Sequence, residues 1–293
     1  MPCAFSDYSD AVAARARAAA PLVVGLEWDG RQQISAIRWS DGVIVTSEQS
    51  LPEADSITAI LPGGARVPAA RLGRDPGTNI VALRVDDTAG PAPDTALDVA
   101  PGQSVLALGS DGTGGPRVRK GGVEAVGPAW QSQCGGRIDQ LITLDIRLDH
   151  VAEGGPVIDA AGRLIGMSTF GPRQQVLVIP TATIARVAAQ LAAHGRVARG
   201  WLGVGVQPVA IPGEAAGASA TGLMVLSLAE GSPAAGCLLP GDILISANDT
   251  KLSTPRALTA LLSAEAIGTT LALRLLRGGA VQQTDIAVIG RPA

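Results

Sequence analysis

The sequence has few aromatic residues and no excess of positive charge. Phe, Trp and Tyr together make up 2% of its 293 residues, and 23 Lys and Arg face 26 Asp and Glu. Without a cluster of basic residues, the chain lacks the electrostatic footprint of a nucleic-acid-binding surface or of an anionic membrane surface. Nucleic-acid binding is therefore excluded from the functions that we expect.

Cysteine is also scarce and irregularly placed. Cys3, Cys134 and Cys237 are odd in number and far apart, which indicates neither a disulfide framework nor a zinc site. We expect no metal and no cofactor. No apolar stretch approaches the length of a membrane span. The N-terminus lacks the basic and apolar regions of a signal peptide, so either the chain stays in the cytoplasm or a targeting segment is missing from this sequence.

Glycine and proline, in contrast, are abundant, with 37 and 20 residues. Between about residues 22 and 179 they separate many short apolar or alternating runs, such as DGVIVTS, NIVALRV and QSVLALGS. Short strands with this punctuation and no helices between them are typical of β-barrels and β-sandwiches. The predicted fold class is therefore mainly β.

Three segments break this pattern and divide the chain. Residues 1–21 read as a short helix that Ser6 can cap, ending at Pro21. The spacing of apolar residues after Pro180 predicts a second helix, with Thr181 or Thr183 as its cap. A basic, glycine-punctuated linker follows, so we expect domains at residues 1–21, 22–198 and 199–293. The last contains strands and one helix, near residues 255–263.

Several ordered motifs resemble those of one protease family. Asp41–Gln49, Thr78–Val85 and Leu141–Pro156 follow the three active-site motifs of the HtrA/Deg serine proteases in order and spacing. Arg199–Val204 resembles the start of the PDZ domain that follows the protease domain in this family, and Gly241–Leu244 resembles a turn and strand within it. The resemblance implies a trypsin-like double β-barrel followed by a PDZ domain with an α+β fold.

The resemblance also implies that the catalytic triad is replaced. Gln49, Asn79 and Glu153 stand where the family has His, Asp and Ser, and Val151 stands where it has a glycine of the oxyanion hole. An amide has no usable basicity near neutral pH, and an Asn beside the base changes its hydrogen bonding at a cost of about four orders of magnitude in the chymotrypsin triad. Loss of one oxyanion donor costs about 10²–10³ in rate. We therefore expect a pseudoprotease.

A non-standard active site is the alternative. His150 and Asp149 lie near Glu153, whereas the other histidine, His194, lies at the start of the linker. His150 would lie in the wall of the site instead of at the position of the base. Asp149, His150 and Glu153 match no metal-ligand spacing, so we read them as a surface loop.

Without catalysis, the remaining function that we expect is the binding of a peptide. In the resemblance, Trp201, Leu202, Gly203 and Val204 form the PDZ loop that holds a terminal carboxylate, beside a strand that pairs with the peptide. Apolar candidates for the opposite wall come from the helix, and they compete with plain core packing: Leu258, Leu261 and Leu262. With no Lys or Arg in the loop, we expect a preference for apolar terminal side chains.

Two further expectations come from the family. Its N-terminal segment supplies aromatics to a trimer interface, which here would be Phe5 and Tyr8; a mobile tail is the alternative. Its regulatory loop would be Gly127–Gln140, with Arg137 as the relay arginine and with Trp130 and Cys134 as candidates for partner contact.

The predicted function is therefore that of a catalytically inactive HtrA-like homologue. It would bind unfolded or C-terminally exposed polypeptides as a scaffold, a chaperone-like holdase or a regulatory partner. It would form a homotrimer or mix with an active paralogue. The alternative is an active HtrA-like endopeptidase in protein quality control. The family implies bacteria and a periplasmic or cell-envelope location.

Overall fold

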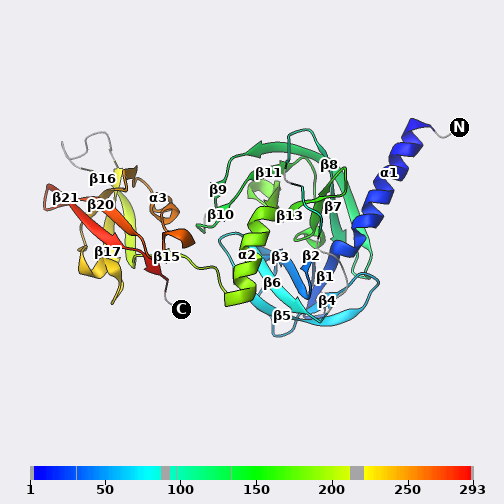
Figure 1. Ribbon diagram of the computed structural model, residues 1–293, viewed down its shortest axis with the longest axis horizontal. Coiled ribbons are helices and arrows are strands. Elements are labelled where there is room, and N and C mark those ends of the chain that lie inside the picture. Colours follow the sequence, from blue (N-terminus) through cyan, green and yellow to red (C-terminus); the bar gives the residue numbers. More distant parts are fainter. Residues whose placement is uncertain are drawn as a thin grey trace. The chain divides into compact units, whose positions relative to one another are not determined.

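The computed structural model describes residues 3–30, 32–86, 93–96, 98–132, 134–211 and 221–291. Its contacts divide the chain into two compact units, Met1–Val197 and Ala198–Ala293. Each unit is described by itself (Figure 1). Among the described residues, no helix has both the length and the apolarity needed to cross a membrane.

The first half of the first unit is a closed six-stranded barrel. Its strands follow the order β1-β2-β3-β6-β5-β4, and neighbouring strands are antiparallel. Buried apolar side chains such as Val24, Ile44 and Leu83 fill it. The strands are β1 (Val23–Trp28), β2 (Gln32–Ser40), β3 (Val43–Ser47), β4 (Thr58–Ile60), β5 (Arg66–Asp75) and β6 (Ile80–Val85).

The second half is another closed six-stranded barrel, in the order β11-β14-β13-β12-β7-β8. Its core contains Ile142, Val157 and Ile165. A small hairpin of β9 (Trp130–Gln131) and β10 (Arg137–Ile138) leaves this barrel between β8 and β11. The barrel strands are β7 (Ser104–Ser110), β8 (Pro116–Gly127), β11 (Leu141–Leu144), β12 (Pro156–Asp159), β13 (Leu164–Phe170) and β14 (Val176–Pro180). The two barrels confirm the mainly β prediction.

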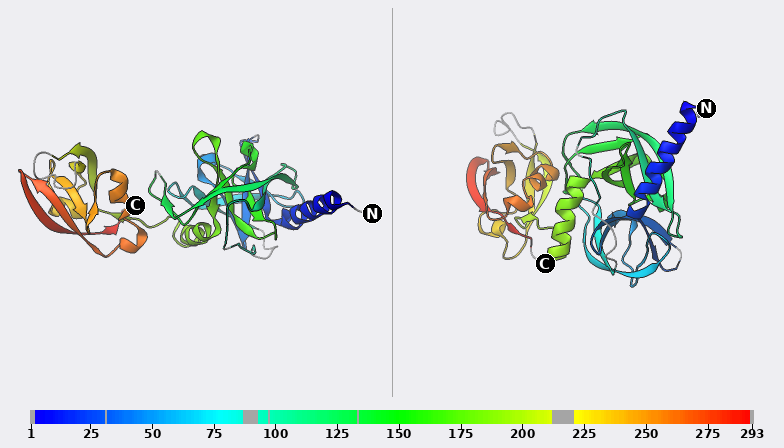
Figure 2. Two further views of the ribbon diagram at one scale, coloured as in Figure 1. Left: turned by 90° about the horizontal axis from the view of Figure 1, so that it is seen from above. Right: turned by 45° about the vertical axis from the view of Figure 1, so that its right-hand side comes forward.

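Helix α2 (Thr181–His194) joins the two barrels. Ile184, Val187 and Leu191 are fully buried in one core cluster with side chains of both barrels, including Val45 and Met167. Figure 2 shows the helix lying along both barrels. The predicted apolar face of this helix is confirmed. Because this one face packs against strands of both barrels, α2 links them.

The predicted N-caps are wrong for both helices. Helix α1 (Ala4–Ala19) begins after Cys3, so Ser6 lies inside it, and α1 has no side-chain cap. Helix α2 begins after Pro180, again without a side-chain cap. The Thr183 hydroxyl instead donates to Asp139 Oδ2 at 2.8 Å, because that carboxylate lies beside the first turn of the helix.

The second unit is an antiparallel sheet with one short helix. The sheet has the order β16-β17-β18-β20-β21, with β19 paired to β18, and β15 pairs with β22. Helix α3 (Pro255–Ala260) contacts β16. The strands are β15 (Gly200–Trp201), β16 (Val204–Ala210), β17 (Thr221–Leu228), β18 (Ile243–Ala247), β19 (Thr250–Lys251), β20 (Thr270–Arg277), β21 (Ala280–Ala287) and β22 (Ile289–Gly290).

One ion pair fixes the turn that enters β18. Arg277 donates to both carboxylate oxygens of Asp242, Nε to Oδ1 at 2.8 Å and Nη2 to Oδ2 at 2.6 Å. The Arg277 guanidinium holds the pKa of Asp242 below its usual value. Asp242 Oδ2 also accepts the N–H of Leu239, so the turn is held at both ends.

Candidate functional site

The three residues that sequence analysis placed at triad positions come together where the two barrels meet. Gln49 lies in a single 3-10 turn after β3, Asn79 lies just before β6, and Glu153 lies in the loop before β12. Gln49 Nε2 donates to Glu153 Oε1 at 2.6 Å, and the backbone N–H of Gln49 donates to Asn79 Oδ1 at 2.7 Å. The three residues therefore form one connected hydrogen-bonded cluster.

The Glu153 carboxylate is the centre of this cluster. Its residue is 1% exposed, and four neutral side chains donate to it. Oε1 accepts from Gln49 Nε2, from the Ser47 hydroxyl at 2.9 Å and from the Thr169 hydroxyl at 3.0 Å. Oε2 accepts from the Ser50 hydroxyl at 2.5 Å. Since a buried charge is costly unless hydrogen bonds replace its hydration, these donors are what make the position tenable.

Sequence analysis did not identify Ser47, Ser50 and Thr169 as members of the cluster. Ser47 and Ser50 belong to the motif around Gln49, and Thr169 follows a buried run in β13. A buried carboxylate requires hydrogen-bond donors, and that requirement is the only basis on which the sequence could have predicted these three residues. It does not say which of the chain's many hydroxyls supply them.

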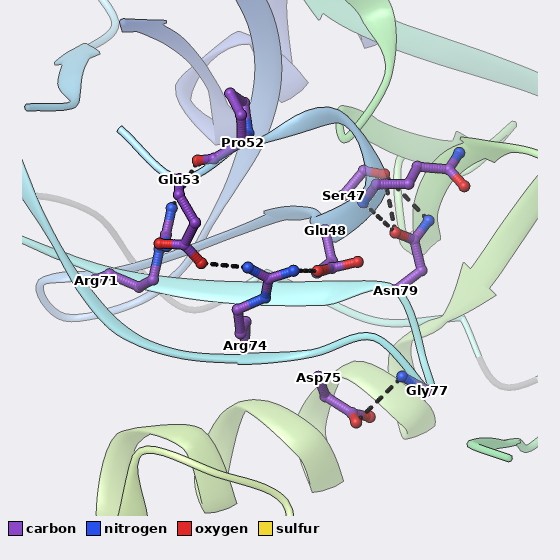
Figure 3. Close-up of polar contacts among 10 residues, drawn as sticks. Ser47, Glu48, Pro52, Glu53, Arg71, Arg74, Asp75, Gly77 and Asn79 are labelled. Atoms are coloured by element: carbon purple, nitrogen blue, oxygen red, sulfur yellow. Dashed lines mark hydrogen bonds and ion pairs between the residues drawn. The ribbon is translucent and has the colours of Figure 1, made fainter. Parts of the chain in front are cut away.

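Asn79 positions the turn that carries Gln49. Its backbone has φ of +59°, a left-handed conformation that Asn tolerates better than most residues. Its Nδ2 donates to Thr169 Oγ1 at 2.7 Å and to Ser47 Oγ at 3.1 Å. Figure 3 shows the Asn79 amide facing Ser47. The amide thereby bridges the first barrel to β13 of the second.

The loop before Glu153 uses its own backbone donors. His150–Ala152 form a 3-10 turn, in which the Glu153 N–H donates to the His150 carbonyl at 3.1 Å. The Ala152 N–H donates to the carbonyl and the side chain of Asp149. The Val151 carbonyl accepts from the Ser35 hydroxyl at 2.5 Å. An oxyanion hole requires N–H groups aimed at the substrate, and the N–H groups of residues 152 and 153 point into this turn.

In the part of the chain that the structure describes, no hydrogen bond joins either histidine to the cluster. The His150 ring packs edge-on against Phe170, with ring centroids 5.3 Å apart, and His150 is exposed. Asp149 pairs with Arg117, at 3.2 Å from Nη2 to Oδ2, and caps its own turn. His194 is the last residue of α2. The residues described include no group of three or more His, Cys, Asp or Glu that fits a metal ion.

An ion-pair network holds the turn of Gln49 from outside. Arg74 donates to both Glu48 and Glu53, and Arg71 donates to Glu53 (Figure 3). Arg71 also donates to the Pro52 carbonyl at 2.8 Å. Arg74, with a smaller effect from Arg71, keeps the pKa of Glu53 below its usual value. These contacts tie the segment from residue 48 to residue 53 onto β5.

A cleft of about 410 Å³ opens beside the cluster. Gln49, Asn79 and Thr169 form part of its wall. Further lining residues come from the segment 127–140 and from β13 and β14, and they include Trp130, Cys134, Ile138, Phe170, Leu177 and Ile179. The structure thus places Trp130 and Cys134 at this cleft, whereas the Arg137 side chain is exposed and pairs with Asp139.

The segment 127–140 is fastened to the turn that carries Asn79. The Ser132 hydroxyl donates to the Gly77 carbonyl at 2.5 Å. A Cβ atom added to Gly136 would lie 2.1 Å from the carbonyl carbon of Gly77, so the two backbones touch. Asp75 accepts the N–H groups of Gly77 and Thr78, which fixes the shape of this turn. The segment therefore forms one wall of the cleft.

In the second unit, the predicted carboxylate-binding loop joins β15 to β16. Gly203 has φ of +73°, and a Cβ atom there would lie 2.1 Å from Ser232 Cβ. Only glycine fits both the conformation and the space. Leu202 and Gly203 lie between two strands, and among the described residues no backbone carbonyl accepts their N–H groups. Such clustered free N–H groups can hold an anion.

The groove candidates behave differently from one another. Leu258 is 4% exposed and belongs to the core, as does the side chain of Leu202. For Leu258 the structure therefore shows the core packing that was the alternative, and its role in lining the groove stays a prediction. Leu261 and Leu262 are partly buried and pack against the same core. The Leu262 carbonyl accepts the N–H of Gly200, which places the end of α3 beside the loop.

These two units are a trypsin-like peptidase domain and a PDZ domain. The family model described as a trypsin-like peptidase domain matches residues 34–167, and the PDZ domain model matches residues 200–288. The chain is an HtrA/Deg family protein, as the ordered motifs predicted.

Named relatives agree. The probable periplasmic serine endoprotease DegP-like of Bartonella henselae is 29% identical over 264 residues, which cover 86% of this chain and 52% of that protein. The one of Brucella suis is 29% identical, over 86% of this chain and 51% of that protein. The solved HtrA-type protease AlgW with decapeptide is 27% identical, with a TM-score of 0.75, over 98% of this chain and 99% of that chain. The chain spans about half the length of the curated relatives.

The role of Glu153 as a buried acceptor predicts a stability effect. Glu153→Ala should lower the free energy of unfolding by about 2–4 kcal/mol, because it leaves four donors without their acceptor and opens a cavity. Glu153→Gln should stay within about 1 kcal/mol of the wild type, since an amide oxygen still accepts and the Ser50 hydroxyl can reorient. Urea denaturation followed by tryptophan fluorescence measures both.

Glu124→Ala is the matched control, because that carboxylate is exposed and has one hydrogen bond, to Gln175. It should change the unfolding free energy by less than about 0.5 kcal/mol. If Glu153→Ala unfolds at the same urea concentration as this control, the carboxylate does not hold the cluster together.

Proposed function

We propose that this chain is a catalytically inactive HtrA-like homologue that binds polypeptide C-termini through its PDZ domain. It acts as a scaffold, a chaperone-like holdase or a regulatory partner of an active relative. The observation that carries the proposal is the buried Glu153 carboxylate, which occupies the expected nucleophile position and is saturated by neutral donors. The similar proteins are named as probable DegP-like serine endoproteases. The proposal differs from these names only in that this chain is catalytically inactive.

The serine hydroxyls around Glu153 must also be considered as nucleophiles, because the Ser50 hydroxyl donates to the Glu153 carboxylate at 2.5 Å. A serine nucleophile requires a base that can take its proton. Glu153 already accepts three other hydrogen bonds, all on Oε1, so most of its acceptor capacity is taken by neighbours other than Ser50. The N–H of Glu153 is also engaged within its own turn, which removes a donor from any oxyanion. We therefore assign Ser50 a role in holding the carboxylate.

A serine-directed fluorophosphonate probe tests inactivity. We expect no labelling of the wild-type chain and no hydrolysis of casein, under conditions where an active HtrA-type protease is labelled fully. Ser50→Ala and His150→Ala are the diagnostic variants. Labelling that disappears in Ser50→Ala, or hydrolysis that disappears in His150→Ala, would support the active endopeptidase with a non-standard site instead.

Peptide binding is the positive half of the proposal. The loop of Gly203 offers free N–H groups, and the adjoining apolar side chains Val204, Leu261 and Leu262 are partly buried. The solved AlgW structures were determined with a decapeptide and a tripeptide, which supports peptide recognition by this kind of chain. Unfolded proteins with exposed C-termini are the proposed partners, in an envelope compartment such as that of the periplasmic relatives.

Fluorescence anisotropy with a labelled heptapeptide that ends in leucine tests this binding. Amidation of the peptide C-terminus should weaken affinity about 10- to 100-fold, because the charge-assisted hydrogen bonds to the loop are lost. Gly203→Ala should abolish binding. Gly278→Ala is the matched control, since Gly278 also has positive φ but has open space around it, and it should bind as the wild type does. Equal affinity for the acid and the amide would reject the carboxylate site.

A homotrimer, or a mixed trimer with an active relative, is the proposed assembly. Helix α1 carries Phe5 at 79% exposure and Tyr8 at 46%, and only Ala16 and Ala19 of this helix are buried. Native mass spectrometry should detect a trimer for the wild type and a shift toward monomer for Phe5→Ala. Leu239→Ala, which removes an exposed apolar side chain from the second unit, should leave the trimer intact. A monomeric wild type would contradict this assembly.

A further inference from the structure

The cleft beside the Glu153 cluster has an uncharged lining. Among the described residues that line it, none is Asp, Glu, Lys, Arg or His. Its volume of about 410 Å³ is that of a small-molecule site, and such sites are mostly apolar with a few polar groups. A charged ligand would lose its hydration in this cleft without gaining a counter-ion. The lining therefore fits an uncharged molecule.

Apolar side chains supply the contact area. Trp130, Phe170 and Leu177 line the cleft and are only partly buried, so each keeps surface that a ligand can cover. Ile138 and Ile179, which also line it, are 2% exposed and belong to the core behind it. Two of the three accessible side chains are aromatic, and aromatic rings pack well against other rings, either offset or edge-on. A ligand with an aromatic body matches this wall.

The backbone at this end of β13 is already engaged. The Phe170 carbonyl accepts from Gln49 Nε2 at 3.1 Å, and the Gly171 N–H donates to the Gln175 carbonyl at 2.8 Å. An extended polypeptide that adds to a sheet as a further strand needs free N–H and carbonyl groups along the edge it joins. Because these two groups have partners within the chain, the cleft favours a compact molecule over an extended polypeptide.

The amide of Gln49 presents one acceptor at the cleft. Its Nε2 donates to Glu153 Oε1 at 2.6 Å and to the Phe170 carbonyl at 3.1 Å. An oxygen in the place of Nε2 would face these two acceptors, so the orientation of the amide is fixed. Oε1 consequently lies on the edge of the amide that faces away from them, and no described residue donates to it. Since Gln49 is exposed and lines the cleft, a ligand can supply the missing donor.

We propose that this cleft binds a small uncharged molecule with an aromatic body and one hydroxyl or amide donor. The body covers Trp130, Phe170 and Leu177, and the donor bonds to Gln49 Oε1. The wall that carries Trp130 is held to the Gly77 turn by the Ser132 hydroxyl, so the site exists before a ligand arrives. This binding needs neither catalysis nor the PDZ domain, and it therefore goes beyond the function proposed above.

A series of naphthalene derivatives tests the site on the full chain, by equilibrium dialysis near neutral pH. Naphthol is uncharged and carries one donor, and it should bind saturably with one site per chain. Its methyl ether keeps the ring but lacks the donor, so it should bind about three- to tenfold more weakly, the worth of one hydrogen bond. Naphthoate and the naphthylmethylammonium ion have the same ring with a charge, and neither should show saturable binding.

Two variants locate the site. Trp130→Ala should weaken naphthol binding about tenfold or more, because it removes one wall. Trp39→Ala is the matched control, since Trp39 is also partly buried against the same core but does not line the cleft, and it should bind naphthol within about twofold of the wild type. Gln49→Met should bind naphthol and its methyl ether equally, whereas a merely structural role of Gln49 would weaken both and keep their ratio.

Thermal unfolding of each variant verifies that the fold is kept, and the comparison of ligands on the wild type needs no variant. Absence of saturable naphthol binding, saturable binding of either charged derivative, or unchanged binding by a folded Trp130→Ala overturns the site. Equal binding of naphthol and its methyl ether to the wild type overturns the contact with Gln49.

Discussion

Burial of the Glu153 carboxylate is the constraint on which the first domain depends. A carboxylate that is 1% exposed must have its hydration replaced, and here the replacement comes from neutral donors on both barrels. Ser47, Gln49 and Ser50 belong to the first barrel, and Thr169 belongs to the second. The cluster therefore links the two barrels through hydrogen bonds to one carboxylate.

The same arrangement explains why these three residues suit one another. Gln49 donates to the Glu153 carboxylate, and Asn79 presents an oxygen to the backbone of residue 49 and an N–H₂ group to Thr169. A carboxylate at position 153 needs such donors. Each of the three residues satisfies hydrogen-bonding needs of its neighbours, so these polar groups are paired within the cluster.

Sequence reasoning was most successful where a pattern has a fixed period or order. The barrels, the apolar face of α2 and the family could be predicted, because alternation, helical spacing and ordered motifs report them directly. The N-caps failed, since Cys3 and Pro180 precede helices in which no side chain reaches back to cap the first turn. The donors to Glu153 lie about 100 residues away in the chain or within another strand, and no local pattern encodes contacts of that range. The choice between core and groove for Leu258 could not be made from the sequence, because apolar residues of the α3 region fit both equally well until the turn of the helix is known.

The contact between Gly77 and Gly136 restricts how these loops can vary. A Cβ atom added at Gly136 would lie 2.1 Å from the carbonyl carbon of Gly77, so position 136 has no room for a side chain while the two backbones stay in contact. The turn of Asn79 and the wall of the cleft are therefore joined at a point where a substitution of Gly136 forces one of the two loops to move. Evolution can reshape the cleft at this point by shifting the backbone, for example through a change in the length of a loop.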